Sequence, residues 1–329
     1  MKRRDLVRAL LVFGVSPWRA FAQPHPGVSR IGFLTSRSRP IAPDRDAFSD
    51  AFSAGMRERG YVEGRNLLIE WRYADGQSAA LADLAADLVR LDVQVIVAYG
   101  TAAVQAAQRA TSTRPIVIAA AVDPVASGLV ASLSRPGGKT TGLSAIAVDL
   151  GPKHVELLKD TIAKLARVAV LVNPGNSSHA AVVGSITAAA KRFGIEVTAV
   201  SARAPADIGA AFATAARART GAVIVAADAF FSGQGRLLAQ WSLETRIPTI
   251  SIYQDHVAAG CLMSYGQNIA EFHRQSATFV DKILKGAKPE DLPVEQPTRI
   301  ELHVNERTAR ALGISIPLSL LLRADEVIR

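Results

Sequence analysis

Cysteine, long apolar runs and aromatic residues are all scarce in this sequence of 329 residues. The one cysteine, Cys261, excludes an intramolecular disulfide framework and any zinc or iron–sulfur site built from clustered cysteines. No stretch beyond residue 22 has the roughly 18 apolar residues of a membrane-spanning helix, so we expect no stable membrane insertion. With 49% hydrophobic and 20% charged residues, the composition excludes general disorder, and the length predicts two domains.

Motifs for bound nucleotides, metals and hydrolytic chemistry are also missing. Gly138-Lys139-Thr140 resembles the end of a phosphate-binding loop, but Leu133 stands where that loop needs glycine. Neither a Gly-x-Gly-x-x-Gly after the first predicted strand nor a Gly-x-Ser-x-Gly is present. The six histidines are too widely spaced for a local metal motif, and only His179, beside two serines, hints at a nucleophile pair. We therefore expect no cofactor, no metal and no catalytic residues.

The N-terminus has the three parts of an export signal. Residues 1–22 begin with Lys2-Arg3-Arg4, continue through an apolar run from Ala9 to Val15, and end in Ala20-Phe21-Ala22. Arg3-Arg4 also resembles a twin-arginine signal. We expect cleavage after Ala22 and a periplasmic location. Because this segment carries five basic residues and one acid, it holds four of the nine net positive charges. The remaining charge does not call for a nucleic-acid partner.

Short apolar runs alternate with Ala- and Leu-rich helical segments from residue 28 onward. Strands that are apolar on both faces, joined by helices, are typical of an α/β fold with parallel sheets. The predicted strands are Ser29–Leu34, Asn66–Arg72, Val93–Ala98, Pro115–Ala119, Arg167–Val172, Glu196–Val200, Ala222–Ala226 and Pro248–Ser251. The predicted helices are Ala42–Gly60, Ser78–Arg90, Thr101–Ala110, His154–Leu165, Ser177–Phe193, Pro205–Arg217, Ser232–Thr245 and about Asn268–Lys285.

A proline- and glycine-rich segment interrupts this strand–helix alternation and favours two lobes over one barrel. Arg135–Gly142 is dense in proline and glycine, and the strand–helix pattern restarts after it. With the extended segments Cys261–Tyr265 and Arg299–Val304, it predicts three hinge crossovers. We expect an N-terminal lobe of residues 28–142 plus about 266–290 and a C-terminal lobe of 143–265 plus about 296–329. A single barrel of strands and helices is the alternative.

Polar and aromatic residues follow the carboxyl ends of these strands, where ligands bind in open parallel sheets. At Gly100-Thr101 a tight turn leads into a helix whose N-terminus would attract a carboxylate. Asp123 and Asp228 suit an ammonium or hydroxyl group, although both aspartates and Thr101 are also good helix N-caps. The predicted ligand-binding residues are Thr35, Ser36, Tyr99, Gly100, Thr101, Asp123, Asn173, Asp228 and Tyr253.

Several motifs together resemble the ABC transporter substrate-binding proteins related to the tryptophan/tyrosine-binding type. The resemblance covers nearly all of the chain after the export signal. It is carried by Ile31–Leu34, Phe52–Asn66, Asp123–Val125, Ser134–Gly138, Leu171–Pro174, Met263–Gly266, Ile283–Gly286 and Leu320–Ile328.

The resemblance implies a type I periplasmic-binding-protein fold, with two Rossmann-like lobes joined by three crossovers. It also implies capture of a small amino-acid-like solute, with aromatic amino acids among the candidates, and delivery to an inner-membrane ABC permease and its ATPase. On this reading Thr101 takes the ligand's carboxylate and Asp228 its amine. Tyr99 departs from the pattern, because a small residue is expected there. A two-lobed racemase or hydrolase and a ligand-sensing partner of a membrane receptor are the alternatives.

Overall fold

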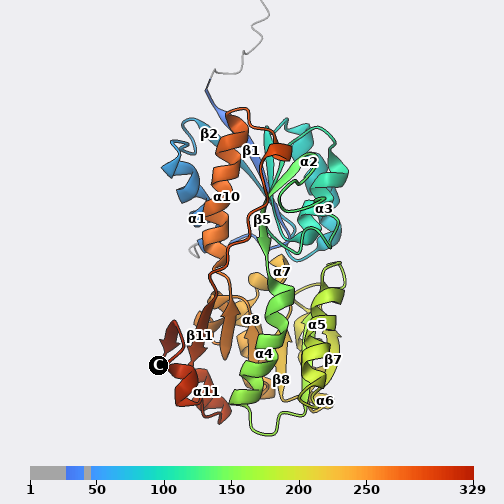
Figure 1. Ribbon diagram of the computed structural model, residues 1–329, viewed down its shortest axis with the longest axis vertical. Coiled ribbons are helices and arrows are strands. Elements are labelled where there is room, and N and C mark those ends of the chain that lie inside the picture. The colour runs from blue at the N-terminus through green and yellow to red at the C-terminus, as the bar shows by residue number, and fades with distance from the viewer. Residues whose placement is uncertain (1–26, 41–45) are drawn as a thin grey trace, which may run out of the picture.

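The computed structural model describes residues 27–40 and 46–329, which form two lobes stacked along the long axis (Figure 1). The export signal expected over residues 1–22 lies outside the described residues. No helix in the described ranges is long and apolar enough to cross a membrane. Each lobe is a β-sheet with helices on both faces, as the strand–helix alternation predicts.

The N-terminal lobe contains a parallel five-stranded sheet in the order β2-β1-β3-β4-β5. The central strand β3 and its neighbour β4 are buried along their whole length because helices cover both faces. The strands are β1 Ser29–Thr35, β2 Leu67–Tyr73, β3 Val95–Tyr99, β4 Ile116–Val122 and β5 Thr140–Ala145. The helices are α1 Ala47–Glu58, α2 Leu81–Arg90 and α3 Thr101–Ala110, with a 3-10 turn at Ser78–Ala80.

Helix α10 (Ile269–Leu284) belongs to this lobe although it comes late in the chain. It runs beside α1 in the upper lobe (Figure 1) and presents Phe272 and Val280 to the core. The helices approach so closely that a Cβ on Gly55 of α1 would lie 2.4 Å from the carbonyl oxygen of Arg274. A glycine therefore permits this contact.

The C-terminal lobe contains a seven-stranded sheet in the order β12-β11-β10-β9-β8-β6-β7. All neighbours are parallel except β10 and β11. The strands are β6 Arg167–Val172, β7 Glu196–Ser201, β8 Ala222–Val225, β9 Thr249–Ser251, β10 Met263–Gly266, β11 Glu301–Asn305 and β12 Glu326–Ile328. The helices are α4 Ala147–Thr161, α5 His179–Lys191, α6 Asp207–Arg217, α7 Ala229–Ser232, α8 Gly235–Thr245, α9 Gln254–Ala258, α11 Glu306–Leu312 and α12 Leu318–Leu321.

The chain passes between the lobes three times, after β5, after β10 and before β11. Each segment expected to be a crossover ends in a strand of one sheet or the other: residues 140–142, 263–265 and 301–304 belong to β5, β10 and β11, while residues 135–139 form the irregular connection ahead of β5. The passages are therefore short: Ile146 between β5 and α4, Gln267 and Asn268 between β10 and α10, and residues 296–300 ahead of β11. Strand β5 carries the first sheet on to Ala145, three residues beyond the expected boundary at 142.

Candidate functional site

A pocket lies between the lobes where the carboxyl ends of their strands face each other. It is narrow: the space left between its walls is about 20 Å³, little more than a single water molecule needs. Strands β3, β4 and β5 supply one wall, and the segments after β8 and β9 supply the other. The lining residues are Tyr99, Gly100, Thr101, Ala120, Ala121, Val122, Ala145, Asn176, Ala227, Asp228, Ala229, Ile252, Tyr253 and Ile269.

Thr101 forms one polar end of this pocket. It is the first residue of α3 and is 2% exposed, and its Oγ1 has no hydrogen-bond partner in the described part of the chain. The first amides of a helix have no partner within the helix and carry partial positive charge. The hydroxyl and the helix terminus together are therefore suited to an anionic group such as a carboxylate.

Gly100 brings the two lobes into contact at this point. Its φ of +95° lies in the region that disfavours a side chain, and an added Cβ would stand 2.7 Å from Cβ of Ala229 across the cleft. A glycine is needed here for both reasons: the turn from β3 into α3 and the close approach of the opposite lobe.

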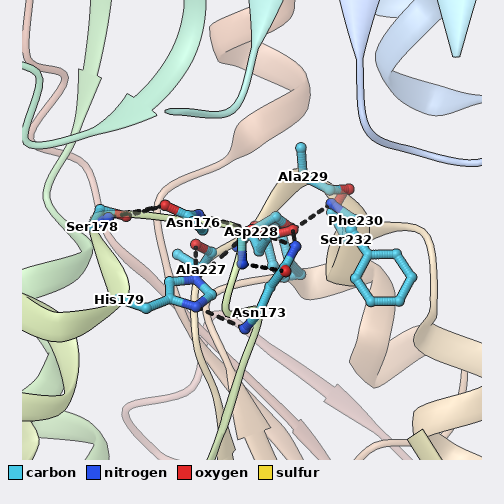
Figure 2. Close-up of polar contacts among 11 residues, drawn as sticks. Asn173, Asn176, Ser178, His179, Ala227, Asp228, Ala229, Phe230 and Ser232 are labelled. Atoms are coloured by element: carbon cyan, nitrogen blue, oxygen red, sulfur yellow. Dashed lines mark hydrogen bonds and ion pairs between the residues drawn. The ribbon is translucent and has the colours of Figure 1, made fainter. Parts of the chain in front are cut away.

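Asp228 forms the other polar end. Its Oδ1 accepts from the Phe230 amide at 2.7 Å and caps α7, while its Oδ2 accepts from Nδ2 of Asn176 at 2.8 Å. Nδ2 of Asn173 lies 3.5 Å from both carboxylate oxygens. Figure 2 shows the two asparagine side chains pointing at this carboxylate from the segment that follows β6. The N-cap role and the place in the pocket thus belong to the same side chain.

His179 lies beneath this carboxylate as a neutral ring. Its Nδ1 accepts from the Asn173 amide at 2.8 Å, so its Nε2 carries the proton and donates to the carbonyl of Ala227 at 3.1 Å. Burial lowers the pKa of His179, although Asp228 opposes the shift. Since both nitrogens bond to the main chain, this ring is not free to act as a general base for Ser177 or Ser178.

The Asp228 carboxylate has no cationic side-chain partner in the described ranges. Nε2 of His179 is 3.8 Å away, and that ring is neutral. Asp228 is only 5% exposed. Its hydrogen bonds all come from neutral donors, the Phe230 amide and the side chains of Asn176 and Asn173. Because buried charges are ordinarily paired, the pocket offers a negative site for a positively charged ligand group.

Two tyrosine rings stand beside these polar ends. The Tyr253 hydroxyl bonds both ways with the main chain of Asp228, accepting from its amide at 2.9 Å and donating to its carbonyl at 3.0 Å. The Tyr99 hydroxyl is buried, and the Ser232 and Tyr253 hydroxyls lie near it without hydrogen-bonding geometry. Burial raises the pKa of Tyr99 to about 12, so this hydroxyl stays protonated.

Four of the nine predicted residues do not line the pocket. Thr35 Oγ1 accepts from the Arg37 amide at 3.2 Å, and the Ser36 carbonyl accepts from the Gly76 amide at 2.9 Å. Asp123 turns back to cap its own turn, accepting from the Ala126 amide at 3.1 Å. The fourth, Asn173, stands behind Asp228 rather than at the surface of the pocket.

The sequence reading omitted Asn176 and the small apolar wall residues. Asn176 is the fourth residue beyond its strand, in Asn173-Pro174-Gly175-Asn176, a turn-forming sequence that could have been a signal. Phe230 and Phe231 are fully buried in the C-terminal lobe and do not line the pocket. The described residues include no group of three or more side chains that could hold a metal ion.

Contacts beyond the pocket also join the lobes. Nε2 of Gln105 on α3 donates to Oγ of Ser177 at 3.0 Å. A Cβ on Gly76 would lie 2.9 Å from the Phe230 ring, and one on Gly233 would lie 3.7 Å from Nε of Arg37. These contacts are those of a closed cleft.

Comparison with known proteins identifies the family. Residues 41–328 match the family model described as ABC transporter substrate binding protein. The chain belongs to this family. Its members are solute-binding proteins, not enzymes. A tyrosine-binding protein from Clostridioides difficile (strain R20291) is 26% identical over 273 residues, which are 83% of this chain and 78% of that protein.

Solved structures of this substrate-binding family share the fold. An ABC domain from Streptococcus pneumonia in complex with L-Trp superposes with a TM-score of 0.81 at 24% identity, over 92% of this chain and 100% of that one. A substrate-binding protein with adhesive properties from Clostridium difficile, in its ligand-free, open form, superposes with a TM-score of 0.60 at 25% identity. The match covers 92% of this chain and 99% of that one.

Proposed function

We propose that this substrate-binding protein captures a small amino-acid-like solute between its lobes and delivers it to an inner-membrane ABC permease and its ATPase. The observation that carries the proposal is the buried Asp228 carboxylate, which lines the pocket without a cationic side-chain partner in the described ranges. A ligand ammonium would supply that partner. The same pocket contains the unpartnered Thr101 hydroxyl at a helix N-terminus, which suits the ligand's carboxylate.

The neighbouring residues support these two roles. Asn176 and Asn173 hold the Asp228 carboxylate, and the Tyr253 hydroxyl holds its peptide group. Gly100 allows the lobes to meet behind the ligand. The tyrosine-binding relative supports an amino acid as the class of solute. Affinity then comes from desolvated hydrogen bonds made on closure, with no bond chemistry.

Titration calorimetry of the purified chain against a panel of amino acids and simple carboxylates tests the proposal. Asp228→Asn keeps a side chain that can cap α7 but removes the charge. Removing one partner of a buried charge pair costs about 2–5 kcal/mol, so the affinity should fall by at least about thirtyfold. Thr101→Val, which removes the hydroxyl and keeps the shape, should cost about tenfold or more.

Asp123→Asn is the matched control, because Asp123 follows a strand end of the other lobe yet turns away from the pocket. Its affinity should equal that of the wild type. Equal affinities for Asp228→Asn and Asp123→Asn would refute the amine site. Binding of simple carboxylates as tightly as amino acids would refute the amino-acid class.

The importer role and periplasmic location rest on the family and on the export signal expected over residues 1–22. N-terminal sequencing of the protein from a periplasmic extract should give Gln23 as the first residue. An intact N-terminus, or recovery with the cytoplasm, would contradict export. Loss of solute uptake after deletion of the chain would separate transport from a sensing role, in which uptake is retained.

A further inference from the structure

We propose that Tyr99 limits the size of the ligand: its ring separates the interlobe pocket from the core of the N-terminal lobe, so that a compact aliphatic amino acid binds in preference to an aromatic one. This inference rests on the proposed function, since it concerns the side chain of an amino acid held by Thr101 and Asp228. It differs from what the tyrosine-binding relative and the L-Trp complex suggest by name.

Tyr99 stands as a partition between two cavities. Its ring lines the interlobe pocket and also a second, smaller cavity of about 10 Å³ in the N-terminal lobe. The side chain is 3% exposed and lies between the two. The rings of Phe33, Phe48, Tyr73 and His273 form much of the wall of the second cavity, together with the Arg37–Asp46 ion pair. An aromatic ligand side chain directed that way would have to displace the Tyr99 ring.

Packing holds the ring in this position. It meets His273 edge-to-face with centroids 4.6 Å apart and Phe48 likewise at 5.7 Å. Phe48 and His273 are in turn stacked on each other at 4.8 Å, so the three rings form one cluster. Displacing the Tyr99 ring would break its contacts with both Phe48 and His273. Because the core is close-packed, these two rings could not simply shift to follow it.

The rest of the pocket is small and aliphatic. Its apolar lining consists of alanines together with Val122, Ile252 and Ile269, and its remaining aromatic ring, Tyr253, has its hydroxyl committed to Asp228. No cationic or acidic side chain besides Asp228 lines it within the described ranges. Such walls complement a branched aliphatic side chain.

Calorimetric titration of the wild type, Tyr99→Ala, Tyr99→Leu and Tyr99→Phe with alanine, valine, leucine, tyrosine and tryptophan tests the proposal. The wild type should bind valine or leucine at least about tenfold more tightly than tyrosine or tryptophan. Tyr99→Ala, which joins the two cavities, should invert that order. Tyr99→Phe keeps the ring and should keep the wild-type order. Tyr99→Leu retains apolar packing against Phe48 and His273, so it replaces the alanine variant if that one does not fold.

Wild-type affinity for tyrosine or tryptophan equal to or above that for valine and leucine would overturn the inference. So would an unchanged order in both Tyr99→Ala and Tyr99→Leu. Neither result contradicts the proposed function, provided that Asp228→Asn still lowers the affinity by at least about thirtyfold. Absence of binding to every amino acid, in the wild type and all variants, would overturn the proposed function and this inference with it.

Discussion

The side-chain hydroxyl of Tyr253 makes two hydrogen bonds with the main chain of Asp228, one as acceptor and one as donor. The hydroxyl accepts from the Asp228 amide at 2.9 Å and donates to its carbonyl at 3.0 Å. All of these atoms are buried. One side chain after β9 thereby fixes the main chain after β8, and with it the direction of the carboxylate that lines the pocket.

Tyr253→Phe should weaken both folding and ligand binding. The ring would remain, but the amide and carbonyl of Asp228 would lose their partner, and each unsatisfied buried group costs about 1–3 kcal/mol. We expect the free energy of unfolding in urea to fall by a similar amount and the ligand affinity to fall about tenfold. Tyr265→Phe, on β10 of the same lobe and outside the pocket lining, is the control. Equal behaviour of the two variants would contradict a positioning role for Tyr253.

Gly100→Ala should hold the cleft open. The new Cβ would meet Ala229 at 2.7 Å, and a side chain at φ +95° and ψ +146° is strained by about 1–3 kcal/mol. We expect at least about a tenfold loss of affinity and a larger radius of gyration in X-ray scattering. Ala229→Gly in the same chain should restore the part of the loss that comes from the contact, but not the part that comes from strain.

Gly184→Ala on α5 is the matched control, because an added Cβ there meets nothing within 4 Å. It should leave affinity unchanged and raise helix stability by about 0.5–1 kcal/mol. If Gly100→Ala behaves the same way, the lobes do not meet at Gly100 in the ligand-bound state.

Acid should destabilise the protein between about pH 6.5 and 4. Burial lowers the pKa of His154, His256 and His273 from 6.5 to about 4. The unfolded chain therefore takes up these protons first. The free energy of unfolding should be highest above pH 6.5 and fall by up to about 1.4 kcal/mol per pH unit for each ring.

Urea unfolding at a series of pH values measures this dependence. His154→Gln can still donate to the Tyr265 carbonyl, which Nε2 of His154 contacts at 2.8 Å. Because this variant lacks one of the titrating rings, its stability should fall by about 1.4 kcal/mol less per pH unit than that of the wild type. Parallel curves for the two proteins would show that His154 does not titrate in this range.

Strand ends could be predicted from the sequence because apolar runs and their polar termini are local properties. That rule found Thr101, Asp228 and Tyr253, all of which line the pocket. The same rule fits Asp123 equally well, yet its carboxylate caps a turn at Ala126 instead. N-capping residues and ligand-binding residues are of the same types, and the choice between the two roles depends on the main-chain path after the strand.

Two other lining residues, Asn176 and Ile269, could not be predicted in this way. Asn176 reaches Asp228 only because the turn after β6 brings them together, and Ile269 belongs to a helix that lies far along the chain from β3. The role of Tyr99 as a partition depends on the packing of Phe48 and His273 from α1 and α10. Such contacts between distant segments leave no mark on local sequence periodicity.

The place of α10 in the N-terminal lobe sets an order of assembly. Ribosomal synthesis completes the first sheet at Ala145, but the helix that covers it ends at Leu284. At a synthesis rate of about 5–20 residues per second, α10 is complete roughly 7–30 s after the last strand of the sheet. During that time the apolar face destined for Phe272 and Val280 remains open to water. Any factor that keeps the nascent chain from folding has that interval in which to act.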